Sequence, residues 1–329
     1  MDIPEPEPAR WKAATGLAQR APQPAVSGGV QCGTAGWTDR TLIQCGRFYP
    51  PGASSARARL EHYARHFRLV EVDATYYTLV GADTVARWVE YTPEGFRFDV
   101  KAFPVLTGHP IDVLRLPQDL RAVAAPLAND RGRVSANRLP DELRLELEGR
   151  FRASLQPLVE AGRLGAVLCQ FPPWFEATRG NARALERLAD EHRGIPLSVE
   201  FRHRSWLASE RRDRVFDLLR HHGLTFVAVD EPASRVGGLP PVIEATTSRL
   251  AVVRFHGRNV AGWDRRGAGV HERFDYLYTP DELRPWVEPL RRVSEEVREV
   301  HAVFNNCVRD YAVVNAKGLS VLIGGSEAG

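Results

Sequence analysis

The sequence predicts a TIM-like (β/α)8 barrel, and three observations predict it. Eight short β-branched runs follow one another along the chain, and amphipathic helical stripes lie between most of them. The 329 residues, 43% of them hydrophobic, suffice for one large α/β domain. Alternating strands and helices require parallel strands with crossover helices, and eight such repeats are the number that closes a barrel. A doubly wound open sheet is the alternative.

The strands and helices are expected in the following order. The strands are Val30–Trp37, Leu69–Tyr77, Arg97–Ala102, Gly165–Phe171, Pro196–His203, Thr225–Asp230, Leu250–Gly257 and Val300–Asn306. Helical spacing of i, i+3, i+4 and i+7 marks a helix over Leu60 to Phe67 and another over Leu283 to Leu290, which Pro280 opens. A further stripe begins at Val215 and stops at Gly223.

Two places depart from a regular repeat, and both chain ends look different from the rest. About sixty residues, roughly 104–163, separate the third and fourth strands, and we expect this insert to form extra helices over one end of the barrel. Pro232 to Ser248 has weak periodicity, so the sixth helix should be irregular or missing. Residues 1–28 are rich in Pro and Ala without periodicity and are expected to be a flexible extension, which leaves 29–324 as a single domain and 325–329 as a tail.

Composition excludes several classes of protein. Lys plus Arg number 44 and Asp plus Glu 41, a balance that does not favour a dedicated polyanion binder. The four cysteines lie far apart without a CxxC pair, so they are expected to be reduced, with Cys307 a packed thiol. No apolar run approaches the length of a membrane span and no secretory signal is evident, so the cytoplasm is the expected location. The sequence leaves the oligomeric state open.

Parity within the strands indicates which side chains face the lumen. Glu71 and Asp73 alternate with apolar residues in the second strand, and Glu200 and Arg202 do so in the fifth. Because the apolar faces must pack against the helices, the charged faces should point inward. The same reasoning, with neighbours at the strand ends, places these further side chains inward: Thr34, Thr75, Asp99, Lys101, Gln170, Ser198, Asp230, Arg254, His256 and Asn305.

A lumen of this kind has two interpretations. Barrel interiors are usually filled by branched apolar side chains, and each buried ion costs several kcal/mol before it is paired. The charges could form a structural salt-bridge network, or they could line a pocket for a polar ligand, which we favour. Aromatic residues that follow the strands, among them Trp37, Trp174, Trp206, Trp263 and Tyr76, would suit a sugar ring or a nucleobase at the same end of the barrel.

Nine motifs resemble the YecE-like family, also called domain of unknown function 72. They are GTAGW (33–37), RFYP (47–50), VEVDATYY (70–77), TPEGFRFDVKA (92–102), QFPPWF (170–175), VEFRHRSW (199–206), FHGRN (255–259), DYLYTPDEL (275–283) and FNNC (304–307). The match covers nearly all of Val30 to Leu322 in order. The resemblance implies a TIM-like barrel and supplies no activity. The family's usual Asn appears here as Asp73, and its Thr-His pair resembles Thr107-Gly108-His109.

The favoured hypothesis is metal-free acid/base catalysis on a small polar substrate, sugar-like or phosphorylated. Glu71 and Glu200 would hold different pKa values if Arg202 or Arg254 paired with only one of them, which leaves the other as a proton donor. His256 and Lys101 complete the catalytic candidates. The expected substrate-binding residues are Thr34, Trp37, Asp73, Tyr76, His109, Gln170, Arg202, Trp206, Asp230, Arg254, Asn259 and Asn305.

Three other hypotheses stay open. No cofactor is predicted, although Glu71, Glu200, Asp230 and His256 are of the types that bind a divalent metal in a barrel isomerase or endonuclease. Lys101, one of only three lysines, could form a Schiff base, although an ion pair with Asp99 is the plainer interpretation. A protein that binds a nucleotide, nucleic acid or sugar without turnover is the third, and for nucleic acid the basic runs 202–204 and 211–212 are the candidate contacts.

Overall fold

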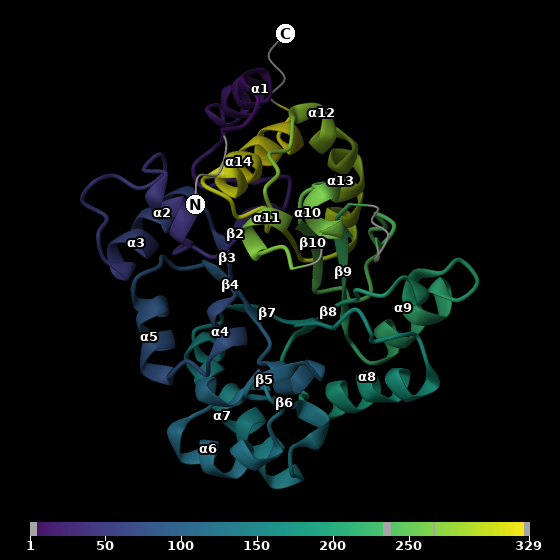
Figure 1. Ribbon diagram of the computed structural model, residues 1–329. Helices are drawn as coiled ribbons and strands as arrows, with labels where there is room; N and C mark the ends of the chain where they lie inside the picture. Colours follow the sequence, from purple (N-terminus) through teal and green to yellow (C-terminus); the bar gives the residue numbers. More distant parts are fainter. Residues whose placement is uncertain (1–4, 233–237, 266, 326–329) are drawn as a thin grey trace.

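A computed structural model describes residues 5–232, 238–265 and 267–325 (Figure 1). Eight parallel strands form a closed barrel, because the first of them pairs with both its successor and the last strand of the chain. The barrel strands are β2 (Val30–Ala35), β3 (Leu69–Val72), β4 (Arg97–Lys101), β7 (Leu164–Gln170), β8 (Leu197–Glu200), β9 (Thr225–Asp230), β10 (Leu250–Phe255) and β11 (Glu299–Phe304). The predicted TIM-like barrel is confirmed.

Helices surround the strands on the outside (Figure 1). They are α2 (Arg40–Gln44), α3 (Ala56–His66), α4 (Ala74–Tyr77), α5 (Ala82–Glu90), α6 (Gln118–Ala124), α7 (Asp141–Glu160), α8 (Arg179–Glu191), α9 (Arg212–His221), α10 (Val260–Asp264), α11 (Val270–Arg273), α12 (Pro280–Leu283), α13 (Val287–Glu296) and α14 (Tyr311–Ile323). The helix expected across Leu283 to Leu290 is divided by a 3-10 turn over 284–286, where Pro285 has no amide hydrogen to donate.

The second and fifth strands are shorter than predicted. The second ends at Val72, and residues 74–77 form α4 instead of extending it. The hydroxyl of Thr75, expected to face the lumen as part of a strand, donates to the carbonyls of Val72 and Lys101. The fifth strand ends at Glu200, so Arg202 lies on the loop that follows.

The irregular sixth repeat is confirmed, while the insert holds more than helices. In the part of the chain described between β9 and β10, residues 231–232 and 238–249, there is no helix. The insert contains α6 and α7, and also an antiparallel pair of strands, β5 (Pro110–Asp112) and β6 (Arg133–Ser135). This pair lies beside the 3-10 turn that follows β4 and stands apart from the barrel sheet.

The N-terminal segment is not a flexible extension over the residues that the structure describes. Helix α1 (Pro8–Ala18) lies against α14 in Figure 1, and β1 (Val26–Ser27) pairs with β2. The buried face of α1 packs against four apolar residues: Leu277, Val308, Tyr311 and Val314. The prediction failed because only Ala14, Ala18 and a partly buried Trp11 face this patch, which is too weak a pattern to register as an amphipathic helix.

Strand register decides which side chains enter the lumen, since paired residues of parallel strands share a face. Arg254 of β10 is paired with Val229 and Val303, and Glu71 of β3 with Ala35 and Asp99. Alternate residues such as Val70 and Phe255 join the apolar layer under the helices. Gly33 is needed for close strand contact, because a Cβ there would lie 2.3 Å from the carbonyl oxygen of Leu69.

The lower part of the lumen holds an ion pair, and strand parity predicted only one of its two members. Asp99 points inward as expected, but its partner is His301 of β11, whose Nδ1 lies 2.9 Å from Asp99 Oδ2, and not Lys101. Nε2 of His301 lies 3.3 Å from Glu299. Although burial lowers the pKa of His301, the two carboxylates outweigh that effect and raise it to about 9.

The stability of the fold should therefore fall in mild alkali. His301 is protonated in the folded chain up to about pH 9 and in the unfolded chain only up to about 6.5. Its contribution, at most about 3 kcal/mol, is complete below pH 6.5 and lost as the pH rises through 9. Urea unfolding between pH 6 and 10 measures the change. His301→Gln should flatten the profile and the exposed His221→Gln should not; an unchanged profile in His301→Gln contradicts the assignment.

Candidate functional site

A fully buried arginine forms the centre of the upper lumen. The guanidinium of Arg254 donates from Nε to Glu71 Oε2 at 2.8 Å and from Nη2 to Glu71 Oε1 at 2.5 Å. Its third nitrogen, Nη1, lies 2.5 Å from Glu200 Oε2. The three side chains come from β10, β3 and β8, and each is at most 1% exposed. Two carboxylates on distant strands are thus bound by one guanidinium, a bidentate geometry that Lys cannot reproduce.

The two carboxylates differ in their other neighbours. Glu200 also accepts a hydrogen bond from Gln170 Nε2 at 2.7 Å and lies 3.4 Å from Arg202 Nη1. Burial opposes ionisation, yet Arg254, His256 and Arg202 together hold the pKa of Glu200 well below its usual range. Burial and the nearby Asp73 raise the pKa of Glu71, and their effect is larger than the opposite effect of Arg254. The pKa of Glu71 is therefore raised to about 7. The predicted separation of the two pKa values follows, although Arg254 contacts both groups.

His256 adjoins this triad with one unsatisfied nitrogen. Its Nδ1 lies 3.0 Å from Asn305 Nδ2, so Nδ1 accepts and the proton is assigned to Nε2. Nε2 lies 3.3 Å from Glu200 Oε1 but is not aligned for a hydrogen bond, and it has no hydrogen-bond partner among the described residues. Burial lowers the pKa of His256 to about 3, so the ring is neutral at physiological pH. The Nε2–H therefore faces the carboxylate of Glu200 at a distance and angle that make at most a weak hydrogen bond.

Partly exposed charges lie above the triad of Arg254, Glu71 and Glu200, at the carboxyl ends of the strands. We call this end of the barrel the mouth. Lys101 Nζ is 3.3 Å from Asp73 Oδ1 and 4.9 Å from the centre of the Tyr76 ring. The Tyr76 ring meets His109 edge-on at 5.4 Å. Burial, followed by Lys101 and Arg202, lowers the pKa of His109 to about 4. Both cations therefore lie close enough to His109 to disfavour its protonation.

Arg202 occupies the other side of the mouth with two partners that the predicted set of site residues lacks. Its Nη1 lies 2.5 Å from Glu231 Oε2, and its guanidinium lies 5.0 Å from the centre of the Trp263 ring. Trp263 Nε1 is buried without a hydrogen-bond partner among the described residues. Glu231 follows directly on a strand, so counting parity one residue further along β9 would have found it. Trp263 belonged to the aromatic residues that follow strands, but no spacing singles it out.

Two residues predicted to face the lumen point the other way. Thr34 is paired with Phe304 of the apolar layer, and its hydroxyl lies 3.0 Å from the hydroxyl of Tyr63 on α3. Asp230 is paired with Phe255, and its carboxylate accepts hydrogen bonds on the outer side of the barrel from Tyr278, Trp286 and Arg258. Both were placed by proximity to a strand end, which does not fix the face.

Three more predicted binding residues are packing or loop groups. Trp37 is 8% exposed and meets Trp88 of α5 edge-on at 5.7 Å. Trp206 stacks on Phe201 and donates to the carbonyl of Phe175, so both its ring face and its N–H contact other residues of the protein. Asn259 caps α10 and donates to the carbonyl of Glu272. Trp206 and Asn259 thus bond within the protein, whereas the Trp37 ring is packed and its buried Nε1 has no hydrogen-bond partner among the described residues.

The predicted metal-binding set is not assembled. Because Asp230 faces outward, it cannot join Glu71, Glu200 and His256 around one ion, and two of those carboxylates already bind Arg254. Within residues 5–232, 238–265 and 267–325 no group of three or more His, Cys, Asp or Glu side chains is arranged to hold a metal. In the same part of the chain, no helix has both the length and the apolar character needed to cross a bilayer.

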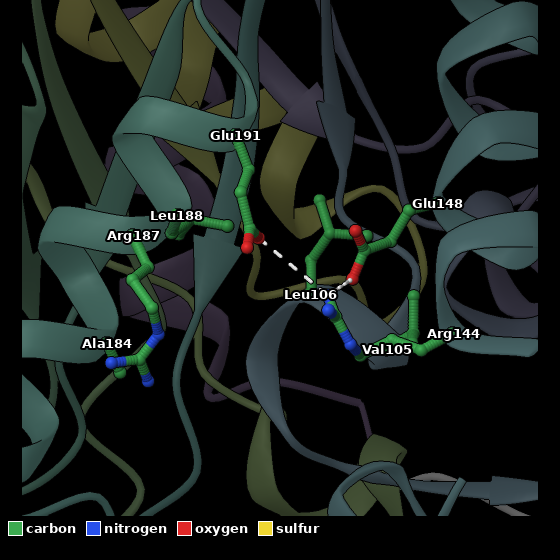
Figure 2. A pocket seen from close by; sticks show the side chains of 8 residues that line it. All are labelled: Val105, Leu106, Arg144, Glu148, Ala184, Arg187, Leu188 and Glu191. Carbon is green, nitrogen blue, oxygen red and sulfur yellow. Dashed lines mark hydrogen bonds and ion pairs between the residues drawn. The ribbon is translucent and has the colours of Figure 1, made fainter. Parts of the chain in front are cut away.

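A cavity of about 330 Å³ lies outside the barrel between α7 and α8. Figure 2 shows Arg144 reaching between Glu148 and Glu191. Its Nη1 is 2.8 Å from Glu148 and 3.7 Å from Glu191. Three of the four charged groups of this cavity thus neutralise one another within the protein. The mouth, where polar atoms are left unsatisfied, is the stronger candidate.

Comparison with known proteins identifies related chains. Residues 31–328 match the family described as "Protein of unknown function DUF72". The UPF0759 protein YunF of Bacillus subtilis is 31% identical over 89% of this chain and 94% of its own length. A DUF72 family protein from Enterococcus faecalis superimposes with a TM-score of 0.73 at 26% identity over 91% of this chain and 97% of that one. A third, from Thermotoga maritima, gives 0.68 at 32% identity, covering 88% and 97%.

Replacing Glu200 with Gln should lower the pKa of Glu71. The guanidinium of Arg254 would then neutralise one carboxylate only, so the charged form of Glu71 would be favoured and its pKa would fall from about 7. Carboxyl infrared spectra over pH 3–9 measure this, with the signal of Glu71 identified by its loss in Glu71→Gln. Thermal melting should show that Glu200→Gln remains folded.

The control is Glu148→Gln, which removes another buried carboxylate paired with an arginine but outside the barrel lumen. It should leave the titration of Glu71 in place. If Glu71 titrates at the same pH in Glu200→Gln as in the unmodified chain, the two carboxylates do not share Arg254 in the way described.

Proposed function

The chain belongs to the DUF72 family of proteins of unknown function, and we propose that it is an enzyme that binds a small anionic substrate at the barrel mouth and transfers a proton there. The observation that carries this proposal is the pair of buried carboxylates, with separated pKa values and one arginine between them, beneath two partly exposed cations. Separated pKa values in one site are the arrangement by which enzymes assign an acid and a base.

The mouth supports binding of an anion. Lys101 and Arg202 are cations with 15% and 16% of their side chains exposed, and each contacts an aromatic ring that restricts its movement. Each is paired with a carboxylate, Lys101 with Asp73 and Arg202 with Glu231, so an anion would compete with these partners, and both cations still act on His109. A phosphate or carboxylate group that replaced water at this position would meet two cations already held in place.

The groups beneath the mouth support proton transfer. Glu71 is the carboxyl whose pKa, about 7, best matches a proton donor or acceptor at neutral pH. Glu200 stays ionised and holds Arg254, while the Nε2–H of neutral His256 can donate to negative charge that develops on the substrate.

Phosphorylated ligands should stabilise the protein more than their neutral parents. In thermal melts with glucose 6-phosphate, ribose 5-phosphate and the free sugars, only the phosphorylated compounds should raise the melting temperature, and salt should weaken the effect. The double variant Lys101→Gln/Arg202→Gln should lose the response. Arg193→Gln removes an arginine that is 81% exposed and should retain it. Equal stabilisation by glucose and glucose 6-phosphate would rule out the anion site.

Replacing the titratable carboxyl group of Glu71 with an amide should impair turnover more than binding. With any anion identified in that screen as a substrate, Glu71→Gln should bind within a few-fold of the unmodified protein, while kcat falls by about 100-fold or more. Isothermal titration and initial-rate assays separate the two effects. A Glu71→Gln protein that keeps its full kcat would show that Glu71 only anchors Arg254.

A further inference from the structure

The mouth combines its cations with aromatic rings in a repeated arrangement. Lys101 lies over Tyr76, Arg202 over Trp263 at 5.0 Å, and the exposed Arg115 over Tyr77 at 5.3 Å. Attraction between a cation and a ring face fixes the cation and leaves its outer side free. The Lys101 and Arg115 pairs adjoin each other, because the ring centres of Tyr76 and Tyr77 are 5.3 Å apart. A compact sugar phosphate would use these charged and planar surfaces only in part.

A ring with an exposed surface continues this arrangement. The rings of Tyr76, His109 and Trp174 follow one another edge-on, with 5.4 Å and 6.0 Å between successive centres. Trp174 is 62% exposed, whereas Trp206 on the neighbouring loop is 1% exposed. A large aromatic side chain normally buries much of its surface, so an indole exposed beside a cationic mouth offers a stacking surface for a planar group.

Unsatisfied polar atoms provide an independent observation. Trp263 Nε1 is a buried donor without a hydrogen-bond partner among the described residues, and its ring centre lies 6.3 Å from that of His256, whose Nε2 faces Glu200 Oε1 at 3.3 Å without good alignment. Buried donors are nearly always satisfied in folded proteins, by protein, water or ligand. The free N–H of Trp263 beside Arg202 suits a ligand with acceptor oxygens, such as the hydroxyls of a sugar.

We infer that the substrate is a nucleotide, either free or as the terminal residue of a single strand. This inference rests on the proposed function and specifies its ligand. Lys101 and Arg202 receive the phosphate, His256 and Trp263 donate to the sugar, and the base stacks on Trp174. Nucleobase stacking on an exposed aromatic ring tolerates any base, so the site selects the class of nucleotide and not one base.

Isothermal titration with inorganic phosphate, ribose 5-phosphate, adenosine 5′-monophosphate and a short 5′-phosphorylated oligoadenylate tests this inference. The monophosphate should bind at least tenfold more tightly than ribose 5-phosphate. Trp174→Leu should remove that difference without changing the affinity for ribose 5-phosphate. The control is Tyr91→Leu, which removes an aromatic ring that has an arginine 4.6 Å from its centre but follows α5 at the opposite end of the barrel.

The possible outcomes separate the two proposals. Tighter binding of the oligoadenylate than of the monophosphate identifies a strand end as the source, and the reverse identifies a free nucleotide. If ribose 5-phosphate binds as tightly as adenosine 5′-monophosphate, or Trp174→Leu has no effect, the nucleotide inference is overturned and the anion site stands. If none of the four ligands binds to the folded protein, both proposals are wrong.

Discussion

A guanidinium that cannot lose its proton is buried in the middle of the barrel, and much of the arrangement around it follows from that fact. Arg254 must be neutralised where water cannot reach, and one carboxylate does not satisfy its five donors. Glu71 and Glu200 satisfy it from two different strands, and β2 contributes only Gly33 and Ala35 to the lumen beside it. Removing Arg254 would leave two buried anions unpaired, a loss typically of about 3–5 kcal/mol.

Sharing one cation between two anions has a chemical consequence. Because Glu200 also has Gln170, Arg202 and His256 as neighbours, the excess negative charge of the lumen falls on Glu71. Protonation of Glu71 therefore balances the charge of the lumen at the lowest cost in free energy. The lower pair of Asp99 and His301 shows the opposite balance, in which two carboxylates keep a histidine charged. The barrel thus has two charged layers. The upper one favours a proton on the carboxyl group of Glu71, and the lower one favours a proton on the imidazole of His301.

The sequence was informative where alternation alone decides the face, and it failed where register or tertiary contacts decide. Within strands, parity placed Glu71, Asp99, Glu200 and Arg254 correctly, because the helices require one apolar face. At strand ends it misplaced Thr34 and Asp230 by one residue and missed Glu231, since a loop can begin at either parity. Helix α1 was missed because its partner surface, on α14 and its approach, belongs to the far end of the chain. The ring pairs of the mouth depend on loop geometry that no spacing encodes.

The first helix also connects the beginning of the chain to the barrel mouth. Arg10 of α1 donates to the carbonyl of Leu277, and the next residue, Tyr278, donates through its hydroxyl to Asp230 and accepts from the amide of Gly257. An expression boundary drawn at Gln31, where the family match starts, would remove that attachment and expose the apolar surface around Tyr311. For crystallisation or assay, the recombinant protein therefore needs the segment that composition alone would have led an experimenter to discard.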